Sequence, residues 1–174
     1  LAGLAEPIDW ADNAWHLPEG AALGAHPLHW AGAFYLQEPS AMAAVAALAP
    51  QPGERVLDLC AAPGGKACQI ADRMHGTGLL LANDPVPARA KVLGRNLERM
   101  GITNAVVLCE PPSRLAAATP PESFDRVLVD APCSGEGMFR KEPAAMAQWH
   151  KELPASCARR QSSILDCAVA MLRP

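Results

Sequence analysis

Short apolar runs alternate with amphipathic segments along the chain from residue 55 onward. Helical patterns, in which apolar residues recur every three or four positions, extend from about 64 to 74 and from 87 to 100. The apolar runs around them read RVLDL (55–59), GLLLAND (78–84), AVVLCE (105–110) and RVLVD (126–130). Four short apolar strands separated by helices are typical of a parallel sheet covered on both faces. The pattern therefore predicts a doubly wound α/β fold.

Other segments flank this pattern. The alanine-rich run SAMAAVAALAP predicts a helix that is capped by Ser40 and ended by Pro50. We expect a Pro-rich loop before the fourth strand and a last helix over 155–174. Residues 1–38 hold three of the four tryptophans, for which core packing is the favoured use, and show little periodicity. We therefore expect a lead-in segment over 1–38 and a partial domain over 39–174.

Composition narrows the class of protein. The chain has 174 residues, enough for one domain, and no apolar run approaches the roughly 18 residues of a membrane span. No secretory signal pattern is visible, so a cytoplasmic location without a membrane partner is expected. The six cysteines form no C-x-x-C pair, which favours reduced thiols over disulfides or a metal site. A net charge of −3 argues against binding of nucleic acid through the overall charge of the chain, although a local basic patch could still bind it. The sequence gives no indication of the oligomeric state.

The run DLCAAPGGKACQ follows the first predicted strand of the sheet, where open parallel sheets bind ligands. A phosphate-binding P-loop is excluded because Cys60 and Ala67 replace its glycine and its Ser or Thr, and no G-x-G-x-x-G motif is present. Asp84 ends the second strand, where a carboxylate can accept both ribose hydroxyls. These residues favour S-adenosylmethionine as the ligand. The simpler alternative is that Gly64 and Gly65 only form a tight turn and that Asp84 caps the next helix.

A second motif, VLVDAPCSGEGMFRK (127–141), puts a carboxylate and a thiol at the same sheet edge. Together with DLCAAPGGK and the upstream FYLQEPSAM, it resembles the Sun family of S-adenosylmethionine-dependent RNA (cytosine-5) methyltransferases. The loop CSGEGMFRK is most similar to the RsmF-like branch, which modifies small-subunit ribosomal RNA. The resemblance implies a Rossmann-like methyltransferase fold whose C-terminal strands follow residue 174, and it implies RNA as the partner.

The resemblance also implies roles for individual residues. Asp84 would hold the ribose hydroxyls, Arg89 would approach the cofactor, and Asp130 would lie between the cofactor and the target base. The family commonly places a further acidic residue after the third strand to meet the adenine, and here Glu110 or a proline stands at that place. The residues implied to wrap the cofactor are Cys60, Ala61, Ala62, Pro63, Gly64, Gly65 and Lys66.

In the Sun family two cysteines share the chemistry. Carbon 5 of cytosine becomes nucleophilic only after a thiolate adds to carbon 6. Cys133 matches the cysteine that assists release of the methylated RNA, whereas the attacking cysteine is expected in a Thr-Cys turn after the last helix, beyond Pro174. Cys157 and Cys167 do not match that motif and are interpreted as core or helix-face thiols. The chain alone is therefore expected to show little turnover.

Two basic residues follow the Asp-Ala-Pro-Cys motif, and two alternative functions remain open. Arg140 and Lys141 are expected to meet an RNA phosphate beside the target base. Cys133 would instead be the nucleophile if the chain worked like DNA cytosine-5 methyltransferases. A noncatalytic RNA- or nucleoside-binding module is the alternative from another class of protein.

Overall fold

The computed structural model describes residues 6–139, 146–147 and 149–174. Its main sheet is parallel and has the strand order β5-β4-β3-β6. In this sheet Val56 pairs with Leu80 on one side and with Arg126 on the other. The strands are β3 (Arg55–Asp58), β4 (Leu79–Asn83), β5 (Ala105–Leu108) and β6 (Arg126–Leu128). All four lie within the runs predicted from the apolar pattern, and the doubly wound α/β fold is confirmed.

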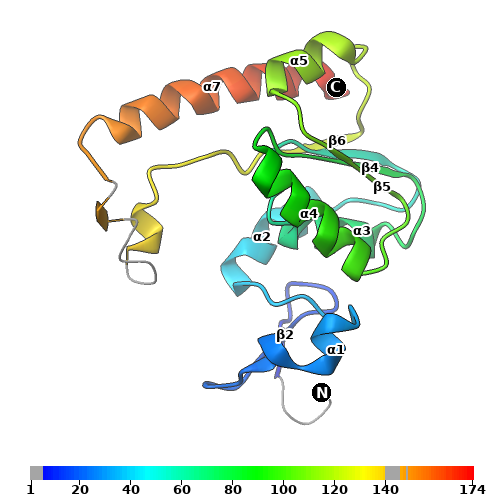
Figure 1. The fold of residues 1–174 in the computed structure, drawn as a ribbon. Coiled ribbons are helices and arrows are strands. Elements are labelled where there is room, and N and C mark those ends of the chain that lie inside the picture. Colours follow the sequence, from blue (N-terminus) through cyan, green and yellow to red (C-terminus); the bar gives the residue numbers. More distant parts are fainter. Residues whose placement is uncertain (1–5, 140–145, 148) are drawn as a thin grey trace.

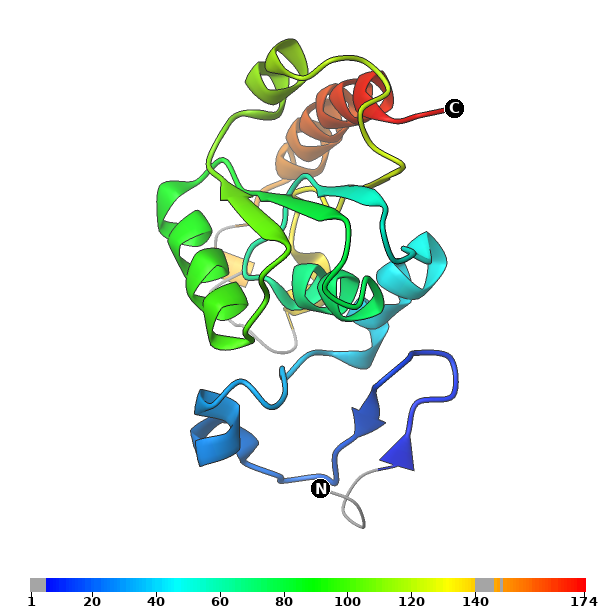
Figure 2. The same cartoon turned by 90° about the vertical axis from the view of Figure 1, so that its right-hand side faces the viewer.

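Helices cover both faces of this sheet (Figures 1 and 2). On one face lie α2 (Pro39–Leu48), α3 (Gly65–Arg73) and α4 (Pro87–Arg99). On the other face lie α5 (Pro112–Ala118) and α7 (Leu153–Met171). A short 3-10 helix, η2 (Glu136–Met138), stands in the loop that leads from β6 to α7. Each crossover therefore returns the chain to the sheet through a helix, as parallel pairing requires.

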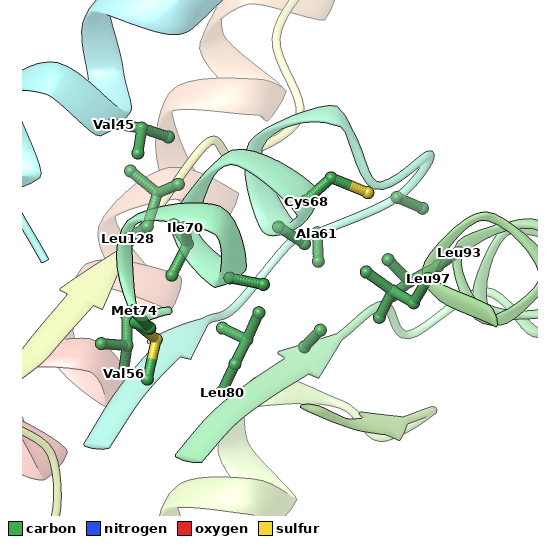
Figure 3. Close-up of a cluster of buried hydrophobic side chains, with 14 residues drawn as sticks. Val45, Val56, Ala61, Cys68, Ile70, Met74, Leu80, Leu93, Leu97 and Leu128 are labelled. Atoms are coloured by element: carbon green, nitrogen blue, oxygen red, sulfur yellow. The ribbon is translucent and has the colours of Figure 1, made fainter. Parts of the chain in front are cut away.

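Two hydrophobic clusters divide the core between the faces. Side chains alternate along β3, so Val56 packs toward α3, whereas Leu57 packs toward α7. Figure 3 shows the first cluster, in which Ile70 of α3 and Met74, the residue after this helix, meet Leu80 of β4. The second cluster joins the sheet to the buried side chains of Leu115, Phe124, Ile164, Ala168 and Met171. Burial on both faces explains why the strands read as continuous apolar runs.

Residues 6–38 lie beyond the α2–α4 layer. They form a two-stranded antiparallel pair, followed by two short helices, and Asp12 forms an ion pair with Arg73 of α3 at 2.8 Å. The elements are β1 (Glu6–Pro7), β2 (Trp15–His16), η1 (Leu23–Ala25) and α1 (Pro27–Trp30). All four tryptophans of the chain are exposed, up to 69% for Trp30, so the expectation of core packing is wrong.

Other differences from the sequence-based prediction concern helix ends. Helix α2 begins at Pro39, so Ser40 lies inside the first turn and is not the cap. The stretch predicted as a Pro-rich loop contains α5, which begins at Pro112 because proline suits the first turn of a helix. Past α7, Leu172 pairs with Phe124 beside the start of β6. Among the described residues, no helix is both long and apolar enough to cross a membrane.

Candidate functional site

The strand order reverses at β3. From β3 the chain winds outward through β4 to β5 and then crosses to β6, on the opposite side of β3. The backbone N–H of Leu59 still donates to the carbonyl of Leu128 at 3.0 Å, so the two strand ends lie side by side. The glycine turn and the Asp-Ala-Pro-Cys loop leave the sheet at these two ends. Ligands bind at such switch points, which makes this edge the candidate site.

The glycine turn is held by side chains of α4. Gly64 adopts a φ of +115° as it begins α3, a conformation that favours glycine. Arg89 donates to the carbonyl of Ala62 at 3.0 Å, and Asn96 donates to the carbonyl of Pro63 at 2.9 Å. A Cβ atom on Gly65 would lie 2.1 Å from Oε1 of Gln37. Gly64 is therefore needed for the turn itself, as the simpler alternative supposed, whereas a side chain at Gly65 would require Gln37 to move. The turn lies at the ligand edge as well.

Lys66 joins the two motifs. Its Nζ lies 2.7 Å from a carboxylate oxygen of Asp130, the first residue of the Asp-Ala-Pro-Cys loop. Asp58 is buried nearby, and neither of its carboxylate oxygens has a hydrogen-bond partner among the described residues. Burial raises the pKa of Asp58 to about 7, Lys66 and the nearby backbone N–H of Cys60 oppose this rise, and the negative charges of Asp130 and Asp84 add to it. A buried carboxyl with so little compensation is a place where a cationic group of a ligand would be stabilised.

Asp84 is fully buried at the end of β4. Its Oδ1 accepts a hydrogen bond from the N–H of Val86 at 3.0 Å, at the start of α4. Its Oδ2 forms an ion pair with Arg89 at 3.1 Å but lacks a partner with hydrogen-bond geometry among the described residues. One oxygen thus serves the turn into the helix, as the simpler alternative predicts, and the other remains able to accept a hydroxyl.

A pocket of about 490 Å³ opens beside Asp84. Its walls include Cys60 from the glycine turn, Arg89 from α4 and Pro132 from the loop after β6. Helix α7 closes it with Arg160, Ser163 and Ile164, and the segments after β4 and β5 contribute Pro85, Val86, Pro112 and Ser113. The lining combines apolar walls with two arginines, two serines and one buried carboxylate, and it suits a nucleoside, because the base needs apolar walls and the ribose needs an acceptor.

The loop after β5 does not present an acid to this pocket. Glu110 forms an ion pair with Arg114 at 3.4 Å and does not line the cavity. Asn83, which the sequence analysis did not select, holds this region together: its amide donates to the carbonyls of Leu59 and Glu110 and accepts from the N–H of Glu110. The signal that could have identified it is a buried amide inside an apolar strand.

The six thiols are free and have different environments. Cys133 is exposed in the loop after β6, and Cys109 is exposed after β5. Burial and the nearby Asp58 raise the pKa of Cys60 to about 11, and burial raises that of Cys68 to about 12. Cys157 is buried and Cys167 is half-buried, as predicted.

Arg140 and Lys141, the predicted phosphate contacts, lie outside the described residues. Across residues 6–139 and the described part of 146–174, no group of three or more His, Cys, Asp or Glu side chains is placed to hold a metal ion.

Comparison with known proteins adds independent support for a family assignment. Residues 45–174 match the family described as 16S rRNA methyltransferase RsmB/F. The chain is 42% identical over 174 residues to "Ribosomal RNA small subunit methyltransferase F" of Citrobacter koseri. That match covers 97% of this chain and 36% of the relative, so the chain spans about a third of the relative's length.

Two solved structures from Pyrococcus horikoshii share the fold. NSun6, solved with SFG, an analogue of S-adenosylmethionine, is 27% identical with a TM-score of 0.77, over 91% of this chain and 39% of that chain. A methyltransferase homolog protein is 29% identical with a TM-score of 0.77, over 98% of this chain and 53% of that chain. The sheet and its helices are therefore those of a methyltransferase fold.

Proposed function

The chain belongs to the 16S rRNA methyltransferase RsmB/F family, and we propose that it forms the cofactor-binding core of an S-adenosylmethionine-dependent RNA methyltransferase. The proposed reaction is methylation of carbon 5 of a cytosine in small-subunit ribosomal RNA, through a covalent adduct between cysteine and cytosine. Ribosomal RNA as substrate implies a cytoplasmic place of action.

The ion pair between Lys66 and Asp130 is the observation that carries this proposal. At 2.7 Å it connects the glycine turn, the predicted cofactor loop, with the loop that carries the predicted catalytic residues. Cofactor and target base must meet within a few ångströms for methyl transfer. A side-chain contact between the two loops supports the proposal, because it shows that they lie next to each other.

The residues present fit an S-adenosylmethionine molecule. The pocket beside Asp84 suits the nucleoside, and the carboxylate of Asp84, whose Oδ2 is ion-paired with Arg89 but accepts no hydrogen bond from the described residues, is the predicted acceptor for ribose hydroxyls. The buried Asp58 does not line that pocket, and its charge near Lys66 is proposed to favour a cofactor that carries a sulfonium and an ammonium group. When bound, the cofactor supplies an electrophilic methyl group. The chain's part is to hold it and to exclude water from the buried side of the site.

The proposed chemistry takes place on the target base. A thiolate adds to carbon 6 of cytosine, and the electron pair displaced toward carbon 5 then takes the methyl group. Removal of the carbon 5 proton by a base restores the double bond and expels the thiolate. Asp130 is proposed to lie beside the ring during addition and to accept a hydrogen bond from the base, and Cys133 to assist release of the RNA. The attacking thiolate is proposed to come from a Thr-Cys motif beyond α7.

Calorimetric titration with S-adenosylmethionine tests the cofactor site. Wild-type chain should bind, and Asp84→Ala should weaken binding at least tenfold, or about 1.4 kcal/mol, because a buried acceptor for the ribose is lost. Asp166→Ala, a change of an exposed carboxylate on α7, is the matched control and should bind like the wild type. Absence of heat in a chain shown to be folded would contradict the proposal.

The role of Cys133 needs an experiment of its own, because the exposed thiol beside Asp130 also suits a nucleophile. RNA with 5-fluorocytosine traps the adduct, since fluorine cannot leave as a proton does. Trapping by residues 1–174 that disappears in Cys133→Ser would assign the attack to Cys133. If only a longer form of the protein traps the RNA, and its Cys133→Ser variant still does so, the attacking thiolate comes from the cysteine of the Thr-Cys motif beyond α7. No trapping by either form would favour the noncatalytic binding module.

A further inference from the structure

Helix α7 carries one polar residue within its buried stripe. The stripe follows the helical repeat of alternating four- and three-residue steps and consists of Cys157, Gln161, Ile164, Ala168 and Met171. Its four other members are buried, and Gln161 is half-buried among them. A polar side chain in such a position costs free energy unless its groups are hydrogen-bonded. The partner of Gln161 therefore indicates what the residue is for.

That partner is the loop of Cys133. Nε2 of Gln161 donates to the carbonyl oxygen of Pro132 at 3.0 Å. This carbonyl belongs to the planar peptide group that joins Pro132 to Cys133. A hydrogen bond to this oxygen fixes the orientation of the peptide plane. It therefore also fixes the position of the Cys133 Cα atom, to which the thiol side chain is attached.

Few hydrogen bonds hold this loop. The strand pairing of β6 ends at Leu128. Val129 and Ala131 still pack against the second hydrophobic cluster, but within the described part of the chain no backbone–backbone hydrogen bond outside the regular elements involves residues 129–134. Lys66 from the layer of α3 holds Asp130, and Gln161 from the layer of α7 holds Pro132. The loop is thus hydrogen-bonded at two points, one from each face of the sheet.

We propose that Gln161 is a positioning residue, which holds the Pro132–Cys133 peptide group against α7 so that the thiol stays at the site edge beside Asp130. The inference rests on the proposed function, in which Cys133 acts on the target RNA. Pro132 also lines the nucleoside pocket together with Ser163 and Ile164. One helix therefore bounds the cofactor pocket and orients the cysteine loop.

Backbone ¹⁵N relaxation of the whole 174-residue chain tests this directly, with Gln161→Leu as the variant. Leucine has a similar volume and continues the apolar stripe, but it lacks the N–H donor. In the wild type the amides of Cys133 and Ser134 should have order parameters near the rigid value of about 0.85, and in Gln161→Leu they should fall below about 0.6. Ser162→Ala, an adjacent exposed change, should leave them unaltered.

Thermal unfolding of the same samples separates positioning from a merely structural role. A positioning residue predicts an unchanged or higher Tm for Gln161→Leu, because an apolar isostere fits the stripe. A lower Tm with unaltered order parameters would overturn the proposal. Gln161→Met repeats the test if the leucine variant does not fold, and failure of both variants to fold would also overturn it.

Titration of the wild-type sample with S-adenosylhomocysteine keeps the two proposals apart. Resonance shifts at Asp84 and Val86 are expected if the cofactor site is correct. Absence of those shifts would count against the proposed function, while the order parameters of the Cys133 loop would still decide the role of Gln161.

Discussion

The guanidinium group of Arg89 lies 3.1 Å from the buried carboxylate of Asp84 and donates to the carbonyl of Ala62 at 3.0 Å. One side chain thus connects the end of β4 with the glycine turn after β3. The carboxylate is buried, whereas about half of the arginine side chain is exposed. The pair therefore compensates a charge that the protein interior would otherwise hold alone.

Arg89→Met should lower the free energy of unfolding by about 1–2 kcal/mol, a value reduced for solvent screening of the exposed arginine. The reason is that Asp84 loses its cation and Ala62 loses a donor. Urea denaturation measures the change. In an Asp84→Asn background the same substitution should cost less, because the charge to be compensated is gone. Equal costs in both backgrounds would show that the two residues do not interact.

Strand positions could be predicted from the sequence because burial on both faces leaves runs of apolar residues. The order of the strands could not, since nothing in RVLVD states that it pairs beside β3 and not beside β5. Helix α5 was missed because its prolines resemble those of a loop, although Pro112 is its first residue. The local sequence pattern indicates which residues are buried and where turns lie. The pairing of strands depends on contacts between segments that are distant in the sequence.

The places of candidate site residues could be predicted where a motif marks a strand end, as with Asp84 after β4 and the glycine turn after β3, whereas their roles stay predictions. Residues that act through a partner could not be predicted in this way. Gln161 and Asn83 have no motif of their own, and their importance is visible only when Pro132 and Glu110 are seen to accept from them. The tryptophans were misjudged because large aromatic side chains are usually buried, while Trp10 and Trp30 stand on the surface of the lead-in segment.

Stability should depend on pH through Asp58. Its pKa is about 7 in the folded protein, against an ordinary value of 3.8, so the folded state binds more protons than the unfolded state between these values. The free energy of unfolding therefore falls as the pH rises through this window. Asp58→Asn removes the effect, and its stability relative to wild type should increase by about 3 kcal/mol between pH 5 and pH 8.

Urea denaturation of both proteins at the two pH values measures this difference, and the comparison cancels the contribution of the five histidines. Asp166→Asn, exposed on α7, controls for the loss of one surface carboxylate. A difference between Asp58→Asn and wild type that is the same at pH 5 and pH 8 would contradict the buried environment assigned to Asp58.

The glycine turn and α4 predict opposite effects for two Gly→Ala substitutions. Gly64 has a φ of +115°, and a Cβ there would lie 3.2 Å from Cδ1 of Leu93, so Gly64→Ala should destabilise the protein by about 1–2 kcal/mol. Gly94 lies inside α4, and a Cβ added there would meet no heavy atom within 4 Å, so Gly94→Ala should stabilise by about 0.5–1 kcal/mol. Urea midpoints distinguish the two, and a Gly64→Ala protein as stable as wild type would show that the turn does not need its left-handed residue.

Thiol reactivity should separate the cysteines of the site edge from those of the interior. Cys109 and Cys133 are exposed, whereas the pKa of Cys60 is about 11 and that of Cys68 about 12, against an ordinary value of 9.0. At pH 8 the thiolate fraction of Cys60 is therefore about a hundredfold below that of an ordinary thiol. Iodoacetamide should modify Cys109 and Cys133 first, with Cys60 and Cys68 at least about a hundredfold slower, as peptide mass mapping over time would measure.

Denatured protein is the control for this measurement, because all six cysteines should then react at similar rates. Burial lowers the reactivity of Cys60 twice, by hiding the sulfur from the reagent and by disfavouring the thiolate. Cys60 also lines the proposed nucleoside pocket, so S-adenosylhomocysteine should slow its modification further while leaving Cys68, on the buried face of α3, unchanged. Modification of Cys60 as fast as that of Cys109 in the folded protein would mean that the glycine turn opens readily, and that a preformed cofactor loop is the wrong description of it.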